Sequence, residues 1–223
     1  MTPLALPDLP RWIEAHGIAA DPAGWRRTLG DGWALGHDAS RLIVIAGDAS
    51  AEELPALVAE HPRHTVLVPA EREDLAATLR ASGRIVGRAL VHTLADPEAL
   101  PDLEGAEPLP PDAPLPAPLA DELALARTNG RTIWSVWVDD EPVAFAYAPW
   151  RSARWFDVSV DVLPGARQLG LGTLVASTMI RDERAQGREP VWGADEANAA
   201  SLRLARHLGF VASDALWVAP GAM

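Results

Sequence analysis

The sequence predicts an α+β protein, with a smaller α/β domain followed by a mixed, mostly antiparallel sheet that helices flank. Three observations lead to this fold class. Residues 42–93 alternate between β-prone and helical segments. A proline-rich segment, 96–117, then interrupts regular structure. After it, three consecutive β-prone segments precede two helix–strand pairs.

The 223 residues suffice for one large or two small domains. With 48% hydrophobic and 22% charged residues, the composition is that of a folded globular chain. We see no signal peptide at the N-terminus and no apolar run long enough for a membrane span, so a cytoplasmic, bacterial protein is expected.

Charge and cysteine content exclude several classes of function. With a formal net charge of −12, the chain lacks the positive field that attracts nucleic acids and anionic membranes, so neither is an expected partner. The absence of cysteine removes disulfides, thiolate nucleophiles and thiolate metal sites, and no metal is expected. Any bound anion must therefore be held by a local site.

The first domain, residues 1–95, is predicted from alternating patterns. Strands are expected at 42–46, 64–68 and 84–93, with helices between them at 50–60 and 71–81. Ser50 and Glu53 have the spacing of a capping box at the start of the first helix, and Gly83 suits the end of the second. Residues 96–117 form the linker that ends this domain.

The second domain, 118–223, begins with a predicted helix at 119–127. Strands are expected at 132–138, 143–147 and 154–162, in an antiparallel meander. A helix at 172–186 ends before Gly187, and a strand at 190–194 follows. The final helix, 198–208, ends before Gly209, and residues 211–218 form the last strand.

The chemistry-bearing motif is Arg167-x-x-Gly170-x-Gly172, between a predicted strand and a predicted helix. A helix N-terminus presents unpaired amides to an anion, and glycines let the backbone approach it closely. Leu171 stands where a nucleotide P-loop needs lysine, and Val175 stands at the third glycine position of a dinucleotide fingerprint. Both nucleotide classes are therefore disfavoured.

The motif resembles the acetyl-CoA loop of the GNAT N-acetyltransferase superfamily, [RQ]-x-x-G-x-[GA]. The segment from Asn198 to Leu208-Gly209-Phe210 is similar to a later motif of that superfamily. Together the two motifs mark residues 118–218 as GNAT-like. Residues 1–95 would then be a divergent domain, open to interpretation as a degenerate half of the same fold.

The resemblance implies a set of residues that bind acetyl-CoA or another acyl-CoA. The pantetheine arm would pair with the backbone near Val160 and Val162 and with Asn198. Ser201 is a weaker candidate, equally well read as a hydroxyl that bonds its own helix. The pyrophosphate would lie near Arg167 and on the loop amides of Gln168, Leu169, Gly170, Leu171, Gly172 and Thr173.

The catalytic base is less constrained. Asp157 is the first candidate, on a strand face it shares with Trp155, Ser159 and Asp161; the alternative is a solvated sheet face. Glu196, with Asp195, is the second candidate, although acids there also suit a helix start. Many family members have a tyrosine at the position of Ala205, so any general acid is open.

The expected function is N-acetyl transfer from acetyl-CoA to a primary amine by direct attack in a ternary complex. A small molecule or a peptide would supply the amine, with a mild preference for a cationic one. A catalytically silent CoA-binding or interaction protein is the alternative. The resemblance also makes a homodimer an option.

Overall fold

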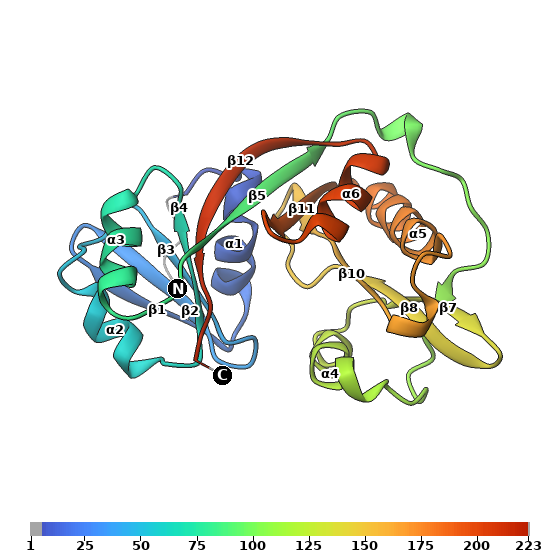
Figure 1. Ribbon diagram of the computed structural model, residues 1–223, viewed down its shortest axis with the longest axis horizontal. Helices are drawn as coiled ribbons and strands as arrows, with labels where there is room; N and C mark the ends of the chain where they lie inside the picture. Colours follow the sequence, from blue (N-terminus) through green and yellow to red (C-terminus); the bar gives the residue numbers. More distant parts are fainter. Residues whose placement is uncertain (1–5, 223) are drawn as a thin grey trace. The chain divides into compact units, whose positions relative to one another are not determined.

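The computed structural model describes residues 6–222; residues 1–5, part of the segment without signal-peptide features, and residue 223 lie outside it. Within these residues, the strands form two hydrogen-bonded sheets (Figure 1). One has the order β1-β2-β3-β4-β12-β5-β11-β9, and the other β10-β8-β7-β6. This mixed α+β fold confirms the predicted fold class.

The chain divides into two compact units. The first comprises residues up to 91 together with 193–198 and the segment from 212 onward; the second comprises 92–192 and 199–211. Two late segments of the sequence therefore belong to the first unit. The division passes through strands β5 (Gly87–Leu94), β11 (Glu189–Asp195) and β12 (Phe210–Ala219).

The first unit is a sheet with helices on both faces (Figure 1). Its antiparallel strands β1 (Gly24–Leu29), β2 (Gly32–His37) and β3 (Leu42–Ala46) are followed by β4 (Thr65–Pro69), which pairs with β3 in parallel. β4 also pairs antiparallel with β12. Its helices are α1 (Ile13–Ala20), α2 (Leu54–Glu60) and α3 (Glu73–Ala81).

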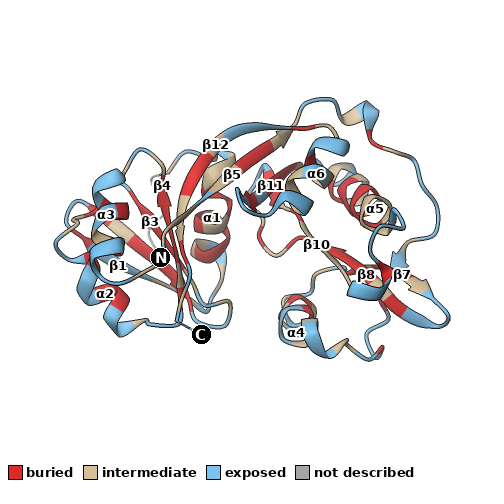
Figure 2. Cartoon of the chain, viewed as in Figure 1, coloured by how far each residue is buried: buried red, intermediate tan, exposed pale blue. Residues whose placement is uncertain are grey.

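The core of this unit lies between the sheet and helices α2 and α3, where buried residues concentrate (Figure 2). Aliphatic side chains fill it, among them Leu29, Ile43, Ile45, Leu54, Leu57, Val66, Val68, Leu75 and Leu79. All nine are fully removed from solvent. With no cysteine in the sequence, burial of apolar surface is the main source of this unit's stability.

The expected elements of the first domain form, with one local error. Strand β3 has the predicted bounds, and the neighbouring elements shift by a few residues. The predicted capping box is wrong: α2 begins at Leu54 without a side-chain cap, because the Glu53 carboxylate instead accepts a hydrogen bond from the Gly30 amide at 3.1 Å. Helix α1 and strands β1 and β2 were not predicted.

The second unit begins with the proline-rich segment. As predicted, this segment has no long element: it holds short 3-10 turns and the two-residue strand β6 (Glu107–Pro108). Helix α4 (Ala120–Thr128) and the hairpin of β7 (Trp134–Val138) and β8 (Glu141–Tyr147) follow. The two-residue hairpin turn has positive φ at Asp139 and Asp140.

The predicted third strand of the meander is divided in two. β9 (Trp155–Asp157) pairs in parallel with β11, whereas β10 (Ser159–Val162) pairs antiparallel with β8. Helix α5 (Leu171–Ala185), strand β11 and helix α6 (Ala199–His207) complete the predicted order. Gly187 and Gly209, just beyond the two helices, have positive φ as predicted.

The two halves of the chain repeat one order of elements. With the divided strand β9–β10 counted as one, each has a helix, three strands, a helix, a strand, a helix and a final strand: α1 to β5 in the first half, and α4 to β12 in the second. In both, the strand after the middle helix pairs in parallel with a strand that precedes that helix, β4 with β3 and β11 with β9. The sequence contains no evident repeat, so this similarity lies in the fold.

Candidate active site

The division of the long strand at Val158 creates the central feature of the site. The amide of Val158 still donates to the carbonyl of Val191 in β11, at 2.9 Å. From Ser159 onward the chain instead pairs with β8, opposite Tyr147. The strand that precedes the loop therefore leaves its parallel partner within two residues, which releases backbone groups of β10 from pairing with β11.

β10 lies at the edge of its sheet, and its register identifies the backbone groups on the open side. The amide of Leu163 donates to Val143 at 2.8 Å, which makes 163 and 143 a hydrogen-bonded pair. Because such pairs alternate along an antiparallel ladder, Val160 and Val162 direct their amides and carbonyls away from β8. These are the two residues that sequence reasoning selected for pantetheine.

The glycine-containing loop presents free amides, as its sequence predicts. A 3-10 turn, Pro164–Ala166, leads into Arg167, and α5 begins at Leu171. In the described part of the chain, the five amides from Gln168 to Gly172 donate no hydrogen bond. Thr173, also predicted for the phosphates, donates to the carbonyl of Gly170 at 3.0 Å. Leu169 is 66% exposed, so no side chain covers the turn at that point.

Two residues of the loop have left-handed backbone conformations. Gly170, the N-cap of α5, has φ of 79°, and Gln168 has φ of 67°. Positive φ costs little for glycine and more for other residues, so Gln168 stores local strain. Alternating handedness along successive residues turns neighbouring amides toward one concave side, which is the geometry of an anion-binding nest.

Gly172 has a packing role as well. A Cβ atom at this position would lie 3.3 Å from Cδ2 of Leu204 on α6, and 3.5 Å from Cγ2 of Val162 on β10. The missing side chain therefore lets the first turn of α5 approach both elements closely. Gly170, by contrast, faces open space.

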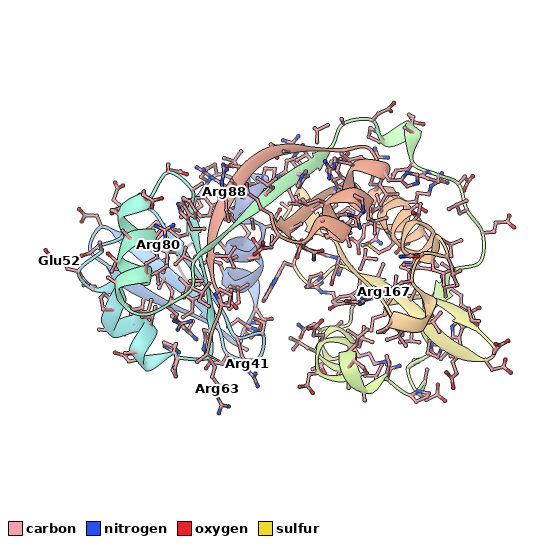
Figure 3. All side chains as sticks on the ribbon, in the orientation of Figure 1. Arg41, Glu52, Arg63, Arg80, Arg88 and Arg167 are labelled. Carbon is pink, nitrogen blue, oxygen red and sulfur yellow. The ribbon has the colours of Figure 1, made fainter. Side chains whose placement is uncertain are left out.

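Arg167 is exposed and extends from the loop beside β10 (Figure 3). Its Nε donates to the carbonyl of Val162 at 3.2 Å. Its positive charge also lowers the pKa of Asp161, partly offsetting the larger upward effect of burial. Arg167 thus contacts one predicted pantetheine-binding residue in this structure.

The residues predicted on the final helix have different surroundings. Asn198 is exposed on the turn before α6, where its amide donates to Asp195, and it belongs to the first unit. The hydroxyl of Ser201 accepts a hydrogen bond from the indole of Trp192 at 2.9 Å. Position 205 of α6 is a fully buried alanine, whose methyl side chain cannot act as an acid.

Asp157, the first candidate base, lies at the end of β9. Burial raises the pKa of Asp157 to about 7, although its carboxylate also accepts a hydrogen bond from the amide of Val158. A carboxylic acid with this pKa can exchange a proton near neutral pH, which an exposed aspartate cannot.

Glu196, the second candidate, forms an ion pair with Arg88 at 3.2 Å, and both side chains are 45% exposed. Its amide also donates to the carbonyl of Arg88. Both residues belong to the first unit, whereas Asp157 belongs to the second. Glu196 is thus exposed and held in an ion pair, whereas Asp157 is partly buried.

Sequence reasoning missed a cluster of polar groups around Tyr147, on β8. Ser159 and Asp161 lie on the same face of the sheet, since Ser159 is opposite Tyr147 and Asp161 opposite Phe145. Ser159 and Glu122, on α4, both hydrogen-bond Tyr147. The strand alternation already grouped Asp157, Ser159 and Asp161, but the partners from α4 and β8 are not local in sequence.

Burial dominates the electrostatics of this acidic cluster, Glu122, Tyr147, Asp157 and Asp161. It raises the pKa of Tyr147 to about 12, with help from the charges of Glu122, Asp161 and Asp157. Although Glu122 is exposed, partial desolvation and the charges of Asp161 and Asp121 raise its pKa too. The pKa of Asp161 is likewise raised by burial. Three carboxylates with raised pKa values would be stabilised by a cation.

Comparisons with known proteins agree with this geometry. The family model described as GNAT acetyltransferase matches residues 133–218. No curated protein sequence matches the chain. In the described residues, no helix combines the length and apolarity that crossing a membrane requires.

Solved GNAT structures share the fold over nearly the whole chain. A protein assigned to the GNAT family of acetyltransferases from Novosphingobium aromaticivorans DSM 12444 has a TM-score of 0.64 and 20% identity, covering 97% of this chain and 98% of its own. A GCN5-related N-acetyltransferase from Kribbella flavida has a TM-score of 0.64 and 17% identity, with coverages of 96% and 95%.

A third similar structure is a tandem GNAT protein from the clavulanic acid biosynthesis pathway, with a TM-score of 0.54 and 16% identity over 96% of this chain and 94% of its own. At these identities the similarity establishes the fold, and the family match identifies the segment that carries the loop. Residues 133–218, which hold the split strand and the loop of free amides, are therefore the segment that matches the GNAT acetyltransferase model, and the fold is that of solved GNAT structures.

Proposed function

We propose that this protein is an acyl-CoA-dependent N-acyltransferase that transfers acetyl from acetyl-CoA to a primary amine in a ternary complex. The family match and the fold support acetyl transfer in general. The observation that carries the proposal is the run of unbonded amides from Gln168 to Gly172, next to the open edge of β10. In a chain of net charge −12, this local site can attract a diphosphate.

In this proposal the loop amides and Arg167 hold the diphosphate, and the β10 edge holds the pantetheine arm. Arg167 would release the carbonyl of Val162 as it turns toward the phosphates. Val160 and Val162 would pair with the pantetheine amides as a further strand would. Ser201, on α6 of the same unit, is a further candidate for the same arm.

Asp157 is the proposed base. An amine must lose a proton to attack the thioester, and a carboxylate with a pKa of about 7 can accept that proton at physiological pH. Tyr147 stays protonated, because its pKa is raised to about 12. Its phenol can therefore donate a hydrogen bond throughout the working pH range.

The acceptor is proposed to be a cationic amine, such as a diamine or a basic peptide. The acidic cluster carries three carboxylates, and among the described residues Arg167 opposes their charge through its effect on Asp161. After the attacking nitrogen has lost its proton, a second ammonium group would still pair with Glu122 or Asp161. This is the substrate class that the chemistry of the cluster favours.

A two-part experiment tests the proposal. Calorimetry with CoA measures cofactor affinity, and thiol release from acetyl-CoA with an amine panel measures transfer. Because the sequence has no lysine, the protein has no internal lysine acceptor to raise the background. Saturable CoA binding with amine-dependent thiol release supports the transferase; absence of CoA binding overturns it.

The alternative, a catalytically silent CoA-binding protein, is favoured by one observation. The position that many family members fill with tyrosine is the buried Ala205. The same experiment separates the two functions, since a silent protein would bind CoA and release no thiol with any amine.

We further propose that the first unit is a degenerate half of the same fold. It repeats the element order, yet the segment before its middle helix, Gly47 to Glu53, carries three acids and lacks the [RQ]-x-x-G-x-[GA] pattern. Negative charge at this position would repel a diphosphate. One CoA bound per chain is therefore expected, which the stoichiometry of the calorimetric titration measures.

A further inference from the structure

A cluster of nitrogen and oxygen ligands lies in the first unit and plays no part in the proposed transfer. Asp38 follows β2, His61 follows α2, and His64 precedes β4. Each offers one ligand atom, and these atoms all lie within 4.8 Å of one another. We propose that Asp38, His61 and His64 form a binding site for a divalent transition-metal ion of the zinc class. Sequence reasoning, which expected no metal, did not pair the two histidines with Asp38.

The distances fit such an ion. Nε2 of His64 and Oδ1 of Asp38 are 3.0 Å apart. A tetrahedral zinc ion with bonds of about 2.0–2.1 Å holds its ligand atoms roughly 3.3 Å apart. Small rotations of the exposed Asp38 and the half-buried His61 would therefore bring all three into range, and a fourth position would remain open on the exposed side.

Surrounding groups fix the ligands in place. The indole of Trp25 donates to Oδ1 of Asp38 at 2.9 Å, and its ring stacks on His61 with centroids 4.8 Å apart. Arg84 donates to the backbone carbonyls of His61, at 3.1 Å, and His64, at 2.8 Å. The turn that carries both histidines is thus held by a single guanidinium, so little order must be gained on binding an ion.

His64 differs from the other buried histidines of the chain. His37 bonds Ser40 at 2.9 Å, and His92 bonds the carbonyl of Trp192 at 3.2 Å, as structural histidines do. The Nδ1 atom of His64 is buried and has no partner among the described residues, and its Nε2 contacts Asp38. Binding an ion at Nε2 needs only the tautomer with the proton on Nδ1, so no other hydrogen bond of this ring is lost.

The ligand set selects the kind of ion. Two neutral imidazoles and one carboxylate would together carry a net charge of −1. The positive charge of Arg41, labelled in Figure 3, opposes a cation and acts on His64. Nitrogen ligands with little net charge favour Zn²⁺, Co²⁺, Ni²⁺ or Cu²⁺, which bind imidazole strongly, over Mg²⁺ or Ca²⁺.

The test is titration of the tag-free full chain with ZnCl₂, followed by calorimetry and thermal unfolding, with MgCl₂ in parallel. We expect one Zn²⁺ per chain, a higher melting temperature with Zn²⁺, and no binding of Mg²⁺. His61→Ala and Asp38→Asn should each weaken zinc affinity at least about tenfold. Asp38→Asn replaces an exposed side chain by one of the same shape, so this variant still tests the role of the Asp38 carboxylate in binding zinc if the histidine variants unfold.

The matched control is His207→Ala, which removes an exposed imidazole from α6. Zinc affinity should be unchanged in this variant. The proposal is overturned if zinc does not bind at one per chain, or if His207→Ala weakens binding as much as His61→Ala does. Because CoA binding is measured separately, either result leaves the proposed transferase function untouched.

Discussion

Gly172 at the start of α5 faces Leu204 of α6 so closely that a Cβ atom there would lie 3.3 Å from Cδ2 of the leucine. The same Cβ would lie 3.5 Å from Val162. The absence of a side chain at one residue therefore sets the separation between the first turn of α5, the edge strand β10 and α6. If the loop binds acetyl-CoA as proposed, a change at this position would affect packing and cofactor binding together.

We predict that Gly172→Val destabilises the protein by about 2 kcal/mol, because its extra methyl groups overpack against β10. Acetyl-CoA affinity should fall with it. Gly172→Ala should cost much less, since the end of the Leu204 side chain can rotate away. Urea unfolding and calorimetry measure both quantities; equal stability of the valine variant and wild type would contradict this packing argument.

Gly170 separates backbone conformation from packing. Its φ is 79°, and a Cβ atom there would meet nothing within 4 Å. Gly170→Ala should therefore lower the free energy of unfolding by roughly 1–2 kcal/mol through backbone strain alone. Gly165→Ala is the control, because a Cβ there also faces open space and its φ is not positive. The two variants should differ clearly in denaturant midpoint.

Asp157 should control the pH dependence of transfer. A base must be deprotonated to act, so kcat/KM should rise with pH through about 7 and level off above it. Asp157→Asn should lower kcat by about 10²–10⁴-fold and abolish that rise, while CoA affinity stays unchanged. A variant that keeps both the rate and the pH profile would assign the base elsewhere.

The same residue gives a prediction about stability. The folded-state pKa of Asp157, about 7, exceeds its ordinary value of 3.8, so the folded protein binds this proton more tightly than the unfolded chain does. The contribution of this bound proton to the free energy of unfolding is fully present below about pH 4 and is lost as the pH rises through about 7. Asp157→Asn should remove this part of the pH dependence, measured as the unfolding free energy at pH 5 and 8.

Glu183, on α5, is 2% exposed and forms ion pairs with Arg151 and Arg188. Glu183→Ala leaves Arg151 and Arg188 without this partner, and should destabilise the protein by about 3 kcal/mol. Asp182→Ala, at the neighbouring position of the same helix, should change stability little. Similar losses in both variants would contradict a specific role of the ion pairs, because alanine by itself favours the helix.

Local patterns account for the parts of the fold that the sequence predicts. The hairpin at Asp139-Asp140, the helix ends at Gly187 and Gly209, and the loop before α5 all depend on nearby residues. The split at Val158 does not, because it depends on the pairing of β9 with β11, more than thirty residues later. The burial of Glu183 likewise depends on a distant residue, because its partner Arg151 lies 32 residues earlier.

The first forty residues show a second limit. α1 is short, contains Gly17, and buries residues on most sides, so it lacks the polar face that identifies a surface helix. The hairpin of β1 and β2 had a usable signal in Gly30-Asp31-Gly32, a turn-forming sequence between β-prone residues. Of the acidic cluster, only Asp157 and Asp161 could be grouped from sequence. Tyr147 on β8 and Glu122 on α4 approach them through tertiary packing.

That cluster provides the last prediction, which concerns the acceptor. A diamine retains one ammonium after its other nitrogen has been deprotonated for attack, whereas a monoamine of the same length retains none. If Glu122 and Asp161 bind that ammonium, the wild type should use cadaverine with a lower KM than pentylamine. Charged hydrogen bonds of this kind are worth about 1.5–3 kcal/mol, or at least tenfold in affinity.

Glu122→Gln and Asp161→Asn should each reduce the preference for cadaverine about tenfold by raising its KM, with pentylamine kinetics and CoA affinity unchanged. Asp112→Asn, an exposed acid in the proline-rich segment, is the control for loss of general negative charge. A reduction of the same size in that control would assign the preference to the net charge of the protein. A reduction confined to the Glu122 and Asp161 variants would assign the preference to specific recognition beside Tyr147. Both carboxylates lie close enough to Tyr147 to help raise its pKa, Glu122 from α4 and Asp161 from β10.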